Sequence, residues 1–269
     1  MGKTLTYAQR YLRWWAPVLA PTALRLLDLI QDGLRARPPG VILDVGTGTG
    51  TLAVAARTRW PRARVIGIDP DAEMLAVARS EADRTFGRDH RVEFLSGTAS
   101  AIPLPDGSVD ALVSSFVLQL VGDRAAAWRE ARRVLRPGGV VAVVSWRGDT
   151  PAFRPQGVFD RTLAEFGLAS GNGSSHPGGL GSPSSAAADL RTAGFRDVES
   201  HLEPLGYRFE PQFFMGWKEQ LDERRLFDSL DGSARERLHI ALRERLSGLT
   251  PDELVRHDPV VYVTGRRSG

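Results

Sequence analysis

The sequence predicts an α/β fold with a mostly parallel, seven-stranded sheet, an N-terminal helix and a helical cap inserted late in the chain. Two observations lead to this prediction. Short apolar runs alternate with segments of helical periodicity, which is typical of helices that connect parallel strands. The runs are apolar at successive positions, as expected for strands that helices cover on both faces.

The first half of the chain contains five predicted strands and four predicted helices. The break at Pro38 and Gly40 separates the N-terminal helix from the first strand. Asp123 is a suitable cap for the last of these helices, which should end at Pro137. The predicted helices are 7–35, a segment that begins near Leu52, 71–80 and 123–136. The predicted strands are 41–43, 65–68, 92–95, 110–116 and 140–145.

The second half of the chain does not continue this regular alternation of strands and helices. A stretch rich in glycine, serine and proline, 170–185, is predicted to be an exposed loop. Ser182 and Pro183 are a suitable start for a helix that Gly194 ends. The remaining predicted elements are a strand within 195–208, helices over 211–247 and a strand at 260–264.

These elements predict three parts of the chain. Residues 1–40 form an N-terminal helical segment, and residues 41–210 with 258–269 form the α/β core. Residues 211–257 form a helical cap between the last two strands.

Composition narrows the function classes. The chain has no cysteine, and its five histidines show no ligand spacing, so we expect no metal site. A net charge of +3 predicts no nucleic-acid partner. No apolar run reaches the roughly 20 residues of a membrane helix, so we expect no membrane anchor. The lack of cysteine fits a cytoplasmic location, and a homodimer stays open.

The strongest chemical signal is a Gly-x-Gly-x-Gly run between the first strand and the helix after it. Glycines let a ligand approach the backbone closely, and a helix N-terminus offers free amides. A dinucleotide site requires Gly-x-Gly-x-x-Gly, whose third position falls here on Thr51. That spacing disfavours a dinucleotide, and a tight turn without a ligand is the remaining alternative.

Asp69 follows the second strand, about 20 residues after the glycines. A carboxylate at this place can accept hydrogen bonds from both hydroxyls of a ribose. Because Asp69-Pro70 also precedes a helix, Asp69 could instead serve as the helix N-cap. Both roles are compatible.

Four motifs, in order along residues 41–146, resemble class I S-adenosylmethionine-dependent methyltransferases. The third and fourth are similar to the ubiquinone/menaquinone C-methyltransferase-like branch, whose members act on small molecules. The motifs are ILDVGTGTG (42–50), IGIDP (66–70) followed by Met74, GTASAIPLPDGSVD (97–110) and LRPGG (135–139). The resemblance implies a Rossmann-like fold and S-adenosyl-L-methionine as the cofactor.

The resemblance also implies a role for individual residues. Asp44 would face the amino group of the cofactor, and Thr47 lies in the loop that would hold its methionine portion with Gly46 and Gly48. Asp69 and Pro70 would border the ribose. The adenine would lie against Met74, Thr98 and Ala99, and Ser115 with Phe116 would line the floor near the sulfonium. The family usually has aspartate where this chain has Thr98, and a hydroxyl accepts from the adenine amino group less strongly than a carboxylate.

Aromatic residues outside these motifs are further candidates. In proteins of this resemblance the N-terminal helix folds over the cofactor, so Tyr11 and Trp15 could contact it, the alternative being plain helix packing. In the predicted cap, Phe214 and Trp217 suggest an apolar or aromatic substrate, although they could be core. His176 in the glycine-rich loop could act as a base or stand in solvent.

The predicted function is methyl transfer from S-adenosylmethionine to an O, N or C nucleophile of a small, quinone-like or natural-product-like molecule. No catalytic residue is assigned, since an acidic substrate atom needs none beyond positioning. The alternatives are an RNA or protein methyltransferase with the same cofactor domain, and a non-catalytic protein that binds S-adenosylmethionine.

Overall fold

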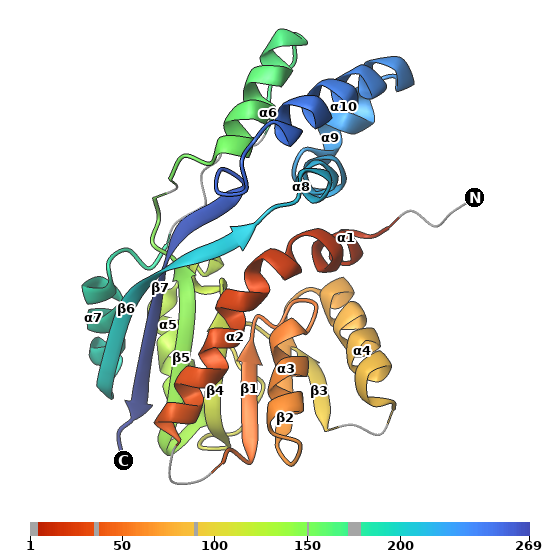
Figure 1. Cartoon of the computed structure of the whole chain (residues 1–269). Helices are drawn as coiled ribbons and strands as arrows, with labels where there is room; N and C mark the ends of the chain where they lie inside the picture. Colours follow the sequence, from red (N-terminus) through yellow and green to blue (C-terminus); the bar gives the residue numbers. More distant parts are fainter. Residues whose placement is uncertain (1–4, 35–37, 89–90, 150, 172–178) are drawn as a thin grey trace. The chain divides into compact units, whose positions relative to one another are not determined.

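A computed structural model describes residues 5–34, 38–88, 91–149, 151–171 and 179–269 of the chain (Figure 1). It confirms the predicted fold: a seven-stranded sheet with the strand order β3-β2-β1-β4-β5-β7-β6. The strands are β1 Val41–Val45, β2 Arg64–Asp69, β3 Val92–Ser96, β4 Val109–Ser115, β5 Leu135–Trp146, β6 Phe195–Arg208 and β7 Val255–Arg267.

The order of the strands sets where a ligand can bind. β1 pairs in parallel with β2 on one side and with β4 on the other, so the direction of strand succession reverses between β1 and β4. Such a switch point leaves a crevice at the carboxyl ends of the two strands, where ligands of open α/β sheets bind. β7 pairs antiparallel with β5 and makes the sheet mixed.

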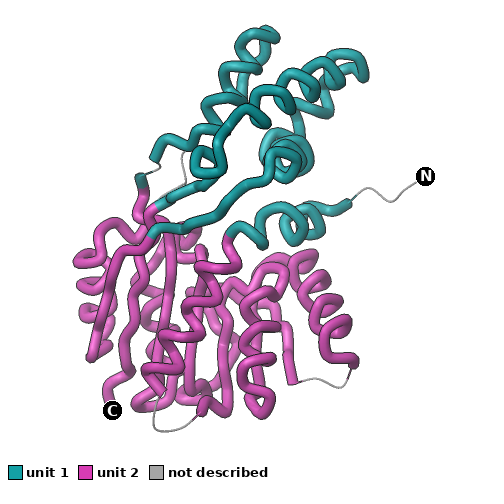
Figure 2. Tube along the Cα trace, in the orientation of Figure 1, with its two compact units in different colours: residues 1–18, 149–175, 204–258 teal, residues 19–148, 176–203, 259–269 magenta. Residues whose placement is uncertain are grey.

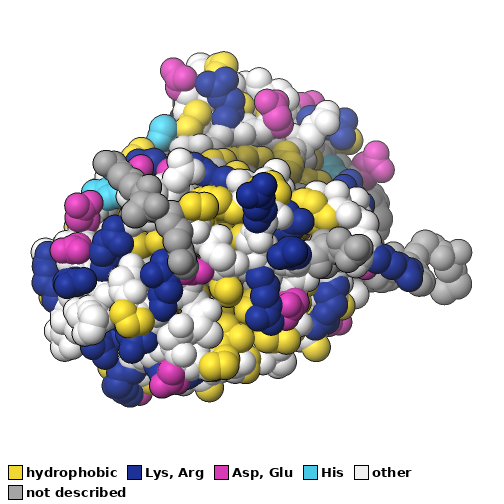
Figure 3. Space-filling model, turned by 90° about the horizontal axis from the view of Figure 1, so that it is seen from below, with side chains coloured by type: hydrophobic (Ala, Val, Ile, Leu, Met, Phe, Trp, Pro, Cys, Tyr) yellow, Lys and Arg dark blue, Asp and Glu magenta, His cyan; other side chains and the backbone are white. Residues whose placement is uncertain are grey.

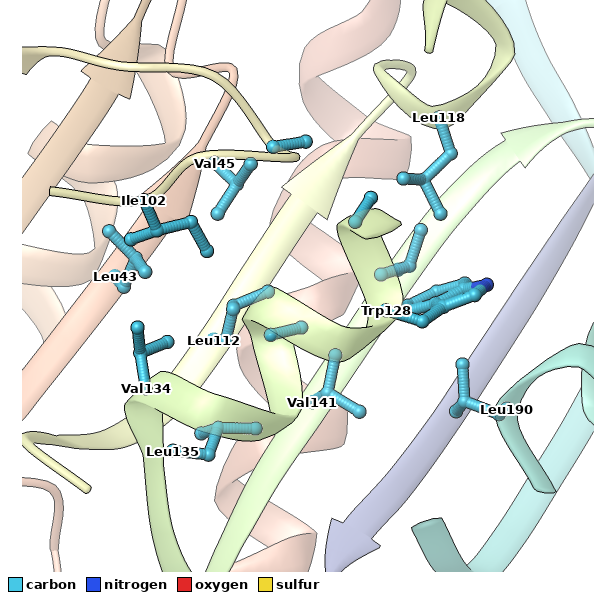
Figure 4. Close-up of a cluster of buried hydrophobic side chains, with 14 of the residues drawn as sticks. Leu43, Val45, Ile102, Leu112, Leu118, Trp128, Val134, Leu135, Val141 and Leu190 are labelled. Atoms are coloured by element: carbon cyan, nitrogen blue, oxygen red, sulfur yellow. The ribbon is translucent and has the colours of Figure 1, made fainter. Parts of the chain in front are cut away.

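Helices cover both faces of this sheet. In Figure 1, α2 (Ala16–Gly33) and α3 (Thr51–Arg59) lie in front of it and α5 (Arg124–Val134) lies behind it. On the α5 side, Trp128 and Val134 lie in one buried cluster with Leu112 and Val141 of the strands (Figure 4). Burial of these apolar surfaces contributes roughly 25 cal/mol per Å² and is the main force that holds the layers together.

The remaining helices follow from local caps and packing. Asp123 accepts a hydrogen bond from the Ala126 amide at 2.9 Å, and Ser182 accepts one from the Ser185 amide at 3.1 Å, as expected for the caps of α5 and α7. These helices are α1 Tyr7–Trp14, α4 Ala72–Phe86, the 3₁₀ turn η1 Leu118–Leu120, α6 Arg154–Glu165, α7 Pro183–Thr192, α8 Pro211–Trp217, the π turn η2 Lys218–Asp222, α9 Arg224–Ser229 and α10 Gly232–Ser247.

Two predicted helices differ from the structure. The helix predicted to run through Arg136 ends at Val134, and the residues from Leu135 onward already belong to β5. A proline disfavours helical geometry in the residue before it, so Pro137 forces this earlier change. The helix predicted over 7–35 breaks at Trp15, because Pro17 has no N–H to donate to the carbonyl of Arg13.

The chain divides into two compact units, coloured separately in Figure 2. Unit 1 comprises residues 1–18, 149–175 and 204–258, and unit 2 comprises residues 19–148, 176–203 and 259–269. The predicted cap, 211–257, therefore forms one unit with α1 and with α6, a helix that the sequence analysis did not predict. The reason is packing: α10 lies against α6 and α8, and α1 lies against α8 and η2.

Candidate cofactor-binding site

The glycine-rich loop follows β1 in unit 2, and its three glycines differ in the space around them. Gly46, Gly48 and Gly50 all have positive φ angles, of 71°, 53° and 83°. A Cβ atom on Gly46 would lie 2.1 Å from a methyl group of Val117, and one on Gly50 would lie 2.9 Å from Ala78. A Cβ on Gly48 would meet no described atom within 4 Å. Packing therefore explains Gly46 and Gly50, whereas Gly48 leaves its side of the loop open.

Asp69, at the end of β2, is tied to this loop. One carboxylate oxygen accepts a hydrogen bond from the Gly48 amide at 2.9 Å, and the other accepts one from the Asp71 amide at 2.9 Å. Asp71, not Asp69, is the N-cap of α4 and accepts bonds from the amides of Glu73 and Met74. The cap role that the sequence left open for Asp69 therefore belongs to Asp71.

Asp44 is the second carboxylate beside the loop. It is only 2% exposed, and its carboxylate accepts a hydrogen bond from the Thr47 hydroxyl at 2.7 Å. Burial raises the pKa of Asp44 to about 7, and the charge of Asp69 adds to this increase, while the bond from Thr47 opposes it. A cationic group placed beside Asp44 would favour its ionised form. The loop is thus bordered by two carboxyl groups that would attract a cation.

The carboxyl end of β4 adds a strained residue at the switch point. Phe116 has φ of 57°, a value that residues other than glycine rarely adopt. Its ring lies 4.3 Å from the ring of Trp146, centroid to centroid, and Ser114 donates a hydrogen bond to the Val45 carbonyl at 2.9 Å. Such strain persists only where the surrounding structure enforces it, and it is common at functional sites.

A compact loop after β3 carries Thr98 and Ala99. Thr98 and Ala101 exchange backbone hydrogen bonds of 3.3 and 3.1 Å, which turns the chain sharply. Thr98 is exposed and Ala99 is 7% exposed. Within the described part of the chain, the Ala99 amide donates no hydrogen bond. Met74, on α4, is 9% exposed. An exposed hydroxyl and an unused amide are therefore available to a ligand here.

The aromatic candidates lie in unit 1. Trp15 stacks on Trp217 with ring centroids 5.2 Å apart and planes 11° apart. Phe214 is fully buried and contacts Trp217, so it forms part of the core of this unit. Tyr11 is partly exposed on α1. His176 lies outside the described residues.

Sequence reasoning missed a buried cation in this unit. Lys218 is 2% exposed, forms an ion pair with Asp222, and lies 4.7 Å from the ring centroid of Trp217 and 4.9 Å from that of Phe159. A lysine in a helical segment is normally read as solvent-exposed, so no signal in the sequence pointed to it.

The opposite edge of the sheet, at the amino ends of the parallel strands, has a surface of mixed charge and a pocket of its own. Seen from below in Figure 3, basic side chains there are mixed with acidic and apolar ones. A pocket of about 370 Å³ lies at this edge, lined by Gln31, Asp32, Leu34, Pro38, Pro39 and Trp60. Because Pro38 and Pro39 precede β1 and the glycine loop follows it, this pocket is separate from the candidate site.

Among the described residues, no group of three or more histidine and acidic side chains is arranged to hold a metal ion. None of the helices in the described ranges combines the length and hydropathy needed to span a membrane.

The sequence of this chain is similar to the sequences of known methyltransferases. Residues 43–143 match the family described as a methyltransferase domain. Malonyl-[acyl-carrier protein] O-methyltransferase of Xylella fastidiosa is 38% identical over 129 residues, covering 47% of this chain and 41% of that protein. Demethylmenaquinone methyltransferase of Thermus thermophilus is 39% identical over 122 residues, covering 45% and 52%. The chain thus spans about half the length of these curated relatives.

Solved structures share the fold over nearly the whole chain. YcgJ protein of Bacillus subtilis has a TM-score of 0.57 at 20% identity, covering 91% of this chain and 99% of that one. Phosphoethanolamine N-methyltransferase 2 of Haemonchus contortus, solved with S-adenosyl-L-methionine, has a TM-score of 0.54 at 17% identity, covering 100% and 62%.

Proposed function

We propose that this chain, whose residues 43–143 belong to the methyltransferase domain family, binds S-adenosylmethionine and transfers its methyl group to a small molecule. The observation that carries the proposal is the pair of carboxyl groups on one glycine loop. Asp44 is buried beneath the loop, and Asp69 is bonded to its open glycine, Gly48. The cofactor carries an amino cation and two ribose hydroxyls, and the pair offers a partner for each.

The residues around the loop fit this cofactor. Asp44 would bind the amino group, which would favour the ionised form of a carboxyl whose pKa burial raises to about 7. Gly46, Thr47 and Gly48 would hold the methionine portion, and Asp69 with Pro70 would border the ribose. The dinucleotide alternative fits less well, because Thr51 already lies in the first turn of α3 where that fingerprint needs its third glycine.

Other residues would contact the adenine base of the cofactor and its sulfonium. The unused amide of Ala99 and the hydroxyl of Thr98 would face the adenine edge, and Met74 would pack against the ring. Ser115 and Phe116, at the carboxyl end of β4, would line the floor of the site near the sulfonium. The fixed backbone of Phe116 supports this role, because a rigid floor would keep the methyl group in one place.

The bound cofactor supplies an electrophilic methyl group on a positively charged sulfur. The protein's task is to hold a nucleophilic O, N or C of the substrate in line, about 3 Å from that carbon, which can supply much of the rate. We assign no side chain as a general base.

The substrate would be a small apolar or aromatic molecule. The name of one relative, demethylmenaquinone methyltransferase, supports a small-molecule acceptor. The name of another, malonyl-[acyl-carrier protein] O-methyltransferase, indicates a small acyl group carried on a protein. The stacked rings of Trp15 and Trp217 in unit 1 support an aromatic acceptor, and Trp217 of the cap, 211–257, would select it. Contact of Tyr11 and Trp15 with the cofactor stays a prediction. A cytoplasmic location, the lack of a nucleic-acid partner and a homodimer stay predictions.

Calorimetry with S-adenosylhomocysteine and with NAD⁺ tests the cofactor. We expect the first ligand to bind and the second not to. Mass spectrometry of candidate small molecules, incubated with purified protein and labelled S-adenosylmethionine, tests the reaction. Binding of NAD⁺ in preference to S-adenosylhomocysteine would contradict the proposal, and labelled RNA or protein would favour the alternative acceptor class.

A further inference from the structure

Two charged side chains of α5 hold the loop that contains Thr98 and Ala99. Glu130 accepts a hydrogen bond from the Ile102 amide at 2.8 Å. Arg133 donates to the Ile102 carbonyl at 2.9 Å and to the Leu104 carbonyl at 2.8 Å. The two side chains also bond each other, at 2.7 and 2.8 Å. Both backbone groups of Ile102 are thereby fixed by one ion pair on a helix.

Arg133 makes two further contacts with the loop. Arg133 pairs with the carboxylate of Asp106 at 2.7 Å, and its own carbonyl accepts a hydrogen bond from the Gly107 amide at 2.9 Å. A surface ion pair alone contributes little to stability, typically 0–1 kcal/mol. An arginine that bonds two backbone carbonyls and two carboxylates in its planar fork fixes geometry as well as charge.

The loop itself has little freedom to move. A Cβ atom on Gly97 would lie 2.7 Å from the ring of Pro103, so the two arms of the loop are in close contact. The Thr98–Ala101 bridge closes the tip between them. Ala99 lies inside this closed tip, and its orientation therefore depends on what fixes Ile102.

The amide of Ala99 is the group that this arrangement would present to a base. An N–H donor matches adenine, whose ring nitrogen N1 is an acceptor. Hypoxanthine carries a hydrogen on N1, so the same amide would face a second donor. Because Thr98 offers a neutral hydroxyl and no charge, a large share of base recognition would fall on the backbone.

We propose that Glu130 and Arg133 are positioning residues that set the selectivity of the site for an adenine base. The inference rests on the proposed function, since it assumes that the ligand is an adenosyl compound. The ion pair acts through the backbone of Ile102 and does not touch the ligand. The competing explanation is a clamp that only stabilises the fold.

The test compares S-adenosylhomocysteine with S-inosylhomocysteine by calorimetry. For the wild-type protein we expect the adenosyl compound to bind at least about tenfold more tightly. Arg133→Lys keeps the charge but loses the fork that bonds both carbonyls, and Glu130→Gln keeps an acceptor but loses the ion pair. For Arg133→Lys we expect the preference to fall below about threefold, and for Glu130→Gln to fall less.

The chain offers a matched control. Glu81 and Arg84 form the same Glu-x-x-Arg pair on α4, and among the described residues neither side chain forms a hydrogen bond or ion pair with the 97–107 loop. Arg84→Lys should keep the full preference for the adenosyl compound. Thermal unfolding of each variant reports stability separately from base selectivity.

Each outcome has one interpretation. A lost preference in Arg133→Lys, with the fold intact and Arg84→Lys unchanged, supports the proposal. A full preference in folded Arg133→Lys and Glu130→Gln overturns it and leaves the proposed function standing. A wild-type protein that binds neither compound overturns the proposed function as well. If Arg133→Lys unfolds, Glu130→Gln alone decides between these outcomes.

Discussion

Asp69 and Gly48 are joined by a 2.9 Å hydrogen bond, although 21 positions separate them in the sequence. The bond runs from the amide of the loop's open glycine to the carboxylate at the end of the neighbouring strand. A ligand that lies on Gly48 therefore meets a negative charge that is already held in place. The second oxygen of Asp69 is held by the Asp71 amide, so the carboxylate has a defined orientation.

The first prediction concerns this carboxylate. Asp69→Asn keeps an oxygen that can accept from one amide but removes the charge. Hydrogen bonds to charged groups contribute about 1.5–3 kcal/mol each, so S-adenosylhomocysteine should bind at least about tenfold more weakly. Calorimetry measures the affinity. Asp71→Ser, which keeps a helix cap two residues away, is the control and should bind normally. Normal affinity in folded Asp69→Asn would leave the carboxylate with a purely structural role.

The second prediction is a pH dependence of cofactor binding. Burial raises the pKa of Asp44 to about 7 in the free protein. A cationic amino group binds the ionised form, so the pKa of Asp44 in the complex is lower than in the free protein. The affinity is then fully present above about pH 7 and decreases as the pH falls through 7, by up to about tenfold per pH unit. Calorimetry between pH 5.5 and 8 checks this.

Asp44→Asn is the matched variant for the pH experiment. It keeps an oxygen that can accept from the Thr47 hydroxyl, but it does not titrate. We expect its affinity to be lower than that of the wild-type protein at pH 8 and nearly constant over the same range. A variant with the same pH profile as the wild-type protein would assign the titration to another group.

The third prediction separates two glycines of the loop. Gly46→Ala places a Cβ 2.1 Å from Val117, so it should lower the midpoint of thermal unfolding strongly. Gly48→Ala meets no described atom within 4 Å, and it costs only the roughly 1–2 kcal/mol of a positive φ angle. Gly48→Ala should therefore fold and lose affinity for S-adenosylhomocysteine. Equal stability of the two variants would contradict this distinction.

The fourth prediction concerns Trp217 in unit 1. Its ring stacks on Trp15 and is 6% exposed, so removing it to alanine could cost about 3–5 kcal/mol. Trp217→Phe keeps an aromatic face and should fold. We expect methyl transfer to an acceptor found by mass spectrometry to decrease, while affinity for S-adenosylhomocysteine stays within about threefold. Trp60→Phe, at the amino edge of the sheet, is the control. Unchanged transfer would place Trp217 outside the substrate site.

The sequence predicted β1, β2 and β4 well because each is a short apolar run with a clear end. β7 was predicted only over its apolar centre, 260–264, whereas the strand extends over Val255–Arg267. The carboxylates and glycines of the site were also predictable, since their spacing from a strand end is a local property. The early end of α5 was not predicted, because the effect of Pro137 on the residue before it competes with a strongly helical pattern. The cap role of Asp71 depends on backbone geometry that composition does not reveal.

The aromatic residues show where sequence reasoning stops. Phe214 and Trp217 are both aromatic and both lie on α8, so the sequence does not distinguish their roles. In the structure Phe214 is fully buried, whereas Trp217 stacks on Trp15. Which face of α8 meets α6, α10 and α1 is decided by tertiary packing between segments far apart in the chain. The burial of Lys218 depends on the same contacts. Local periodicity carries no information about them.

The place of β7 in the sheet has a consequence for how the chain folds. β7 follows β6 in the sequence but lies between β6 and β5. During synthesis β6 has no neighbour to pair with until residues 255–267 have been made, so its backbone donors and acceptors stay unpaired through that interval. Unpaired strand edges are prone to aggregation. We expect the β1–β5 part of the sheet to form first and the β6 side to depend on a late insertion, which makes this edge the vulnerable stage of folding.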